Sequence, residues 1–147
     1  MKQITLLTLI LGMLLTLSCS NDNGFNTLSD ETLNGNVFGE DFIASNGNAI
    51  LTRGEFIAIT LSVSTLSCNG ASEATPLYVT IAVPDRVGFH KNVLAIFGKS
   101  GHEPVTELDA LVEIIEVNET QVVGKIRSKN NKDNRVEGSF AVTICGG

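Results

Sequence analysis

Tryptophan is absent from the 147-residue sequence, and tyrosine occurs once, at Tyr78, beside seven phenylalanines. Flat aromatic faces are common platforms for sugar rings, so this scarcity disfavours carbohydrate binding. Basic residues are also few, with 10 lysines and arginines against 16 aspartates and glutamates. A net charge of −6 argues against a nucleic-acid partner and against a polybasic membrane patch, because both depend on lysine and arginine.

Long hydrophobic runs are also scarce, and the one present, residues 4–17, begins two residues after Lys2. Its 14 residues would make a helix of roughly 21 Å, short of the roughly 30 Å membrane core, so a cleaved signal is favoured over a membrane span. The run ends at Thr16-Leu17-Ser18-Cys19, which resembles a bacterial lipoprotein signal. That resemblance implies a lipid on Cys19 that attaches the protein to a membrane; cleavage elsewhere, with Cys19 lost, is the alternative.

These features divide the chain into three parts. We expect a lipoprotein signal peptide over residues 1–18, a flexible polar tether over residues 19–31, and one domain over residues 32–147. Removal of the first 18 of 147 residues leaves 129, with 9 basic and 16 acidic side chains. A chain of this length can bury a sizeable core.

Of the three cysteines, Cys68 and Cys145 remain once Cys19 is assigned to lipid. An exported chain meets an oxidising compartment, where an even pair favours a disulfide, so we predict a Cys68–Cys145 bridge. A reactive thiol or a metal site is the alternative, but neither cysteine lies in a C-x-x-C or Cys/His spacing.

Alternation with a period of two predicts strands over residues 56–64, 77–83 and 136–145. Shorter strands are expected over residues 33–38 and 42–45, around a tight turn at Gly39-Glu40-Asp41, and over residues 93–97, 112–117 and 120–128. Val93 to Phe97 is expected to be buried on both faces, and a polar loop is expected from Asn130 to Asn134. A short helix from Glu107 to Leu111 stays open. The fold class is therefore all-β, an antiparallel sandwich or barrel of about eight or nine short strands.

The two histidines are the candidate catalytic or metal-binding residues. His90 and His102 lie in a polar stretch from Pro84 to Thr106, where they could bind a metal with Glu103 or support a hydrolase. Loop residues in solvent are the favoured interpretation, so no catalytic residue, metal or cofactor is predicted. An acidic stretch over residues 103–119 precedes a basic stretch over residues 125–135, which predicts cross-strand ion pairs rather than a calcium site. Phe56 and Phe140 are expected in the core.

The lipoprotein signal ends at Leu17-Ser18-Cys19, an opening hairpin is expected over residues 33–44, and the final strand ends at Cys145. In these three features the chain resembles small Bacteroidota cell-envelope lipoproteins with an all-β domain of unknown function. The resemblance implies an outer-membrane or surface location and transfers no catalytic residue. We therefore expect a lipid-anchored binding or structural accessory module without enzymatic activity, acting on an envelope protein or a small ligand. A lipocalin-like barrel holding a small apolar ligand is the main alternative, and a hydrolase is a weak one.

Overall fold

A computed structural model describes residues 27–52, 55–69, 71, 74–129 and 131–146. The predicted signal peptide, Cys19 and the first part of the predicted tether lie outside the described residues. Within the described part the chain forms nine strands: β1 Asn34–Val37, β2 Glu40–Ile43, β3 Asn46–Thr52, β4 Phe56–Ser62, β5 Leu77–Pro84, β6 Gly88–Lys99, β7 Val105–Val117, β8 Gln121–Ser128 and β9 Arg135–Ile144. The described residues contain no helix long and apolar enough to cross a membrane.

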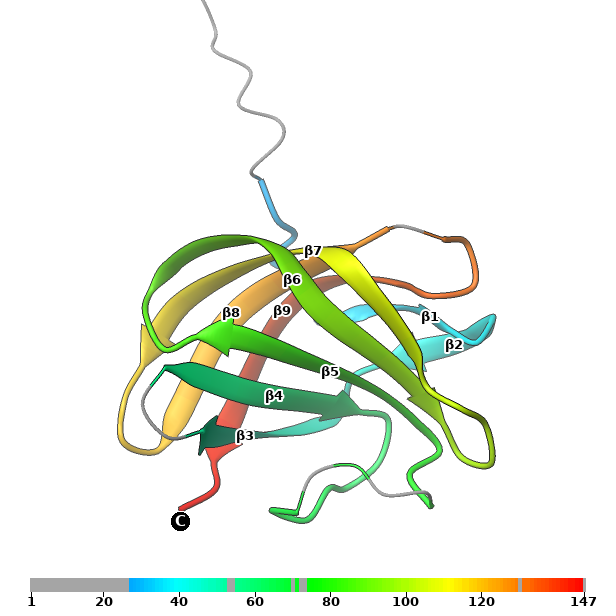
Figure 1. Cartoon of the computed structure of the whole chain (residues 1–147), viewed down its shortest axis with the longest axis horizontal. Helices are drawn as coiled ribbons and strands as arrows, with labels where there is room; N and C mark the ends of the chain where they lie inside the picture. The colour runs from blue at the N-terminus through cyan, green and yellow to red at the C-terminus, as the bar shows by residue number, and fades with distance from the viewer. Residues whose placement is uncertain (1–26, 53–54, 70, 72–73, 130, 147) are drawn as a thin grey trace, which may run out of the picture.

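Seven of the strands close into a barrel in the order β9-β3-β4-β5-β6-β7-β8, and β8 pairs with β9 to complete the circle (Figure 1). All neighbours are antiparallel except β3 and β9, which pair in parallel over two residues of each strand. The β1–β2 hairpin extends the sheet from the beginning of β9. The all-β prediction is confirmed, and of its two architectures the barrel is the one present.

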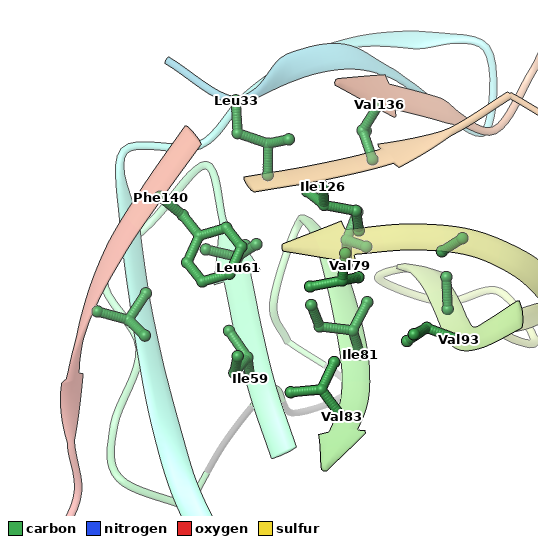
Figure 2. Close-up of a cluster of buried hydrophobic side chains, with 14 of the residues drawn as sticks. Leu33, Ile59, Leu61, Val79, Ile81, Val83, Val93, Ile126, Val136 and Phe140 are labelled. Atoms are coloured by element: carbon green, nitrogen blue, oxygen red, sulfur yellow. The ribbon is translucent and has the colours of Figure 1, made fainter. Parts of the chain in front are cut away.

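The barrel interior is filled by apolar side chains that alternate along each strand. In β4 the predicted inward residues Ile57, Ile59 and Leu61 are all buried, and β5, β8 and β9 follow the same period. Figure 2 shows side chains of β4 and β5 meeting Ile126 of β8 and Phe140 of β9 across the interior. Close packing of such side chains is the main stabilising contribution to a domain of this size.

Three details of the strand prediction need correction. β6 and β7 are far longer than predicted, because each extends past one neighbour to pair with the other. β6 pairs with β7 over residues 88–97 and with β5 over residues 94–99, whereas β7 pairs with β6 over residues 105–114 and with β8 over residues 111–117. Residues 107–111 are therefore strand and not helix, and residues 88–92, expected as loop, belong to β6 together with the predicted strand over residues 93–97. β3 was not predicted, since its sequence begins with Asn46, Gly47 and Asn48 and does not alternate.

The β1–β2 hairpin turns one residue earlier than predicted. Phe38 and Gly39 form the turn, with φ of 52° and 74°, whereas Glu40 already belongs to β2. Two successive positive φ values match the right-handed twist of the flanking strands. The hairpin buries Val37 and Phe42 in the common core, and the ion pair between Lys99 and Glu40 joins it to the end of β6.

A disulfide joins Cys145, just after β9, to Cys68 in the loop that follows β4. The Cα atoms are 5.4 Å apart, and the two residues are separated by 77 positions. The Cys145 amide also donates a hydrogen bond to the Ala49 carbonyl of β3. The predicted bridge is confirmed, and it fastens the C-terminal strand at the parallel β3–β9 junction.

Candidate binding clefts

The interior offers little room for a ligand. Large side chains such as Ile59, Ile81 and Phe97 point inward and are fully buried in one cluster. Barrels of about eight strands have an interior that side chains can fill or that can hold one small ligand, and here side chains fill it. The closed barrel fits the lipocalin-like alternative, but the candidate binding sites lie on its outer surface.

An apolar row crosses the outer wall of the barrel. Ala58 of β4 lies opposite Ala82 of β5, which lies opposite Leu94 of β6, and Leu94 lies opposite Leu108 of β7. Leu108 is 66% exposed, although outward positions on a barrel in water are normally polar. Phe56 and Phe89 lie next to this row and are each almost half exposed.

Together these side chains form a depression, here called the outer cleft, whose lining includes Phe56, Phe89, Leu94 and Leu108 together with Arg86 and Lys91. Its volume is about 510 Å³, within the range of small-ligand sites. None of the described residues that line it is acidic, while Glu55 and Asp85 are chain neighbours outside the lining. The cleft therefore combines apolar walls with two cations.

A β-bulge in β6 shapes this cleft. The register between β6 and β7 shifts on both sides of Val93, and Asn92 has a φ of 54°, which non-glycine residues rarely adopt. Bulges redirect side chains and are enriched next to functional sites. Here the bulged residues Lys91 and Asn92 line the cleft. His90 also lines the cleft but is largely buried, and its Nε2 lies 2.9 Å from the Arg86 carbonyl oxygen in a hydrogen bond.

The structure does not bring together the residues considered for catalysis. His90 lies near the beginning of the 12-residue β6, whereas His102 lies beyond its end. His102 instead bonds through Nδ1 with the Ser100 carbonyl and contacts the ring of Phe38, edge to face at 5.6 Å. Among the described residues, no group of three or more histidines, cysteines and carboxylates could hold a metal.

The ion pairs of the basic stretch differ from those predicted. Glu113 of β7 does lie opposite Lys125 of β8, yet the Lys125 ammonium binds the Asp30 carboxylate instead, at 2.5 Å. Arg127 and Lys129 both contact Glu137 of β9. The pKa of Lys125 is raised, chiefly by the hydrogen bond from its ammonium to Asp30 and less by the charges of Asp30 and Glu113. The acidic stretch is thus not the main partner of the basic one.

A second depression, here called the basic cleft, lies where the β8–β9 loop meets β1. It is lined by Lys129, Lys132, Arg135, Glu137 and residues 34–36 of β1, and its volume is about 720 Å³. Gly35 forms part of its wall and has a φ of 152°. A Cβ at this position would lie 2.0 Å from the Arg135 carbonyl oxygen, so the wall requires glycine here. Three cations and one carboxylate make this region positive on an acidic protein.

The sequence contained incomplete signals for both clefts. Phe56 was predicted as core, but it lies on the outer wall, whereas Phe140 is buried as expected. Leu94 and Ile96 are only half-buried, so β6 is not covered on both faces.

Comparison of the chain with protein family models, curated proteins and solved structures finds no match. Its chemistry is therefore inferred from the geometry of the two clefts.

Proposed function

We propose that this chain is a lipid-anchored, non-catalytic binding module of the cell envelope, and that the outer cleft is its ligand site. The supporting observation is the apolar row bordered by Arg86 and Lys91, above a bulge that holds Asn92 at a positive φ. Residues kept in such conformations cluster at binding sites. The lipoprotein signal and the resemblance to Bacteroidota envelope lipoproteins support the anchor on Cys19 and an outer-membrane location.

The ligand that fits the outer cleft is a small amphiphile with an apolar chain and one anionic group. Phe56, Phe89 and Leu108 offer exposed apolar area for the chain, and burying such a side chain contributes roughly 2 kcal/mol. Arg86 and Lys91 would face the anion, since no acidic described residue lines the cleft. The small apolar ligand considered from the sequence is thus retained, but outside the barrel.

Binding of dodecanoate and of uncharged dodecanol to a chain beginning at Ser20 tests this site by calorimetry. That chain keeps every described residue and the whole core. Leu108→Ser should weaken both ligands about tenfold through lost apolar contact. Arg86→Gln with Lys91→Gln should weaken dodecanoate up to about fivefold and leave dodecanol unchanged.

Ile43→Ser is the matched control, because Ile43 is 63% exposed and does not line the outer cleft. It should leave both affinities unchanged. Equal losses in Ile43→Ser and Leu108→Ser, or no binding of either probe to the parent chain, would contradict the ligand site.

The anchor is tested separately on the full chain in a bacterial host. Metabolic labelling with palmitate should mark the protein and should disappear in Cys19→Ala. Cys68→Ala serves as the control, because Cys68 is engaged with Cys145. Labelling that persists in Cys19→Ala would refute lipidation at this residue without bearing on the outer cleft.

A further inference from the structure

The basic cleft carries positive charge that the protein itself does not neutralise. Glu137 is its one acidic lining residue, and Lys129 and Arg127 already contact that carboxylate. Lys132 and Arg135 form no ion pair with any residue that the structure describes. We propose that the basic cleft faces the membrane and binds the phosphate groups of anionic lipids there, an inference that rests on the lipid anchor proposed above.

The backbone around these two cations is held in place before any ligand arrives. The Phe38 amide donates to Oδ1 of Asn134, and the Gly39 amide donates to the Asp133 carbonyl, so the loop is fastened to the β1–β2 turn. Oδ1 of Asn131 accepts from the amides of Asp133 and Asn134, at 2.8 and 2.7 Å. A preformed loop loses less conformational freedom on binding.

The path of the N-terminal segment places this cleft on the side of the expected anchor. Asp30 binds Lys125, and the Thr27 carbonyl accepts a hydrogen bond from Arg127. Followed from Asp30 back to Thr27, the segment therefore runs along β8 toward the β8–β9 loop. In Figure 1 the blue N-terminal segment lies above the barrel, left of centre, and the orange loop between β8 and β9 lies at the upper right of the same view. Seven residues separate Cys19 from Thr27, and the eight backbone steps between them limit the separation to roughly 28 Å.

The chemistry of the two cations suits a phosphate. Arg135 offers a planar guanidinium that can bind two oxygens at once, and Lys132 adds a flexible point charge. Membrane surfaces present phosphates densely, and each nearby lysine or arginine strengthens attachment to an anionic surface about fivefold. The overall net charge of −6 concealed this local excess.

Vesicle co-sedimentation of the chain beginning at Ser20 tests the proposal without any lipid anchor. We expect binding to phosphatidylcholine vesicles that contain phosphatidylglycerol and little binding to phosphatidylcholine alone. Lys132→Gln with Arg135→Gln should weaken binding about 30-fold at low salt. The matched control is Lys99→Gln with Lys125→Gln, which removes the same charge from two ion pairs outside both clefts and should change binding by at most about twofold.

Equal loss in both double variants would show that net charge alone governs attachment and would overturn the proposal. Amide chemical shifts recorded with inorganic phosphate provide a second arm. Shifts at residues 131–137 together with vesicle binding support a phosphate site at the membrane. Shifts without a preference for anionic vesicles would assign the cleft to a soluble phosphate compound and refute the membrane-facing role. The vesicle assay uses a chain without Cys19. A failure of Cys19 labelling would therefore refute the anchor without changing the vesicle result, so the two failures can be told apart.

Discussion

The outer cleft and the basic cleft differ in how the backbone supports their charged side chains. Arg86 lies in the turn between β5 and β6, and Lys91 lies in the bulge near the beginning of β6, where the register between β6 and β7 is interrupted. Lys132 lies on a loop that hydrogen bonds fix to the β1–β2 turn, and Arg135 begins β9 directly after that loop. Substitutions in the outer cleft should therefore change binding with little effect on folding, whereas substitutions around the basic cleft should change both.

The disulfide closes a segment that contains the cations of both clefts, and its removal should have the largest effect on stability. It connects the end of β9 with the loop after β4. The beginning of β9 lines the basic cleft, and the beginning of β4 lines the outer cleft. Cys68→Ser with Cys145→Ser should lower the free energy of unfolding by about 4 kcal/mol, from the entropy of an unlinked 77-residue loop. Urea unfolding of the oxidised parent and the double variant measures this, and a loss below about 1 kcal/mol would contradict it.

A pair of glycine substitutions separates the two clefts next. Gly35→Ala places a Cβ against the Arg135 carbonyl oxygen and retains a φ of 152°, so we expect a loss of about 3 kcal/mol. Gly88 adjoins the outer cleft and has a φ of 124°, but a Cβ there would meet nothing within 4 Å. Gly88→Ala should therefore cost only about 1 kcal/mol. Equal losses in thermal unfolding would remove the distinction between a locked and an open wall.

The period of two was the reliable sequence signal, because it reports which side chains the pleat turns inward. Ile57, Ile59 and Leu61 were placed on the buried face for this reason, and they are buried. The sequence did not predict β3, because its first three residues are polar or glycine. Its position is set by pairing with β4 and β9. Such long-range pairing leaves no local pattern.

The clefts were not predicted because each depends on residues from several strands. Phe56, Leu94 and Leu108 come from β4, β6 and β7, and only the register of these strands brings them together. That register includes a bulge at Asn92, for which the sequence offers no distinctive signal. The Cys68–Cys145 bridge was predictable, in contrast, because the number of cysteines and the expected compartment limited the choices.

Two asparagine substitutions provide a smaller test of the same contrast. Asn134→Ala removes the acceptor for the Phe38 amide, which should lower the free energy of unfolding by about 1 kcal/mol and loosen the basic cleft. Asn92→Gly removes a similar side chain from the outer cleft but keeps a φ of 54° accessible, so the change should stay within about 0.5 kcal/mol. Hydrogen exchange at the Phe38 amide should accelerate only in Asn134→Ala. Acceleration in both variants would indicate that the clefts are coupled.

The smallest expected effect concerns Lys125, which holds the N-terminal segment on the side of the basic cleft. Its pKa is raised above the usual 10.5, first by the hydrogen bond to Asp30 and then by nearby carboxylate charge. A raised pKa in the folded protein means that this contact stabilises the fold below pH 10.5 and that its contribution is lost as the pH rises through the folded pKa. Asp30→Asn should return the pKa of Lys125 toward 10.5 in a nuclear magnetic resonance titration, whereas Glu113→Gln should lower it less. A larger change in Glu113→Gln would show that the acidic stretch of β7, and not the N-terminal segment, is the main partner of Lys125.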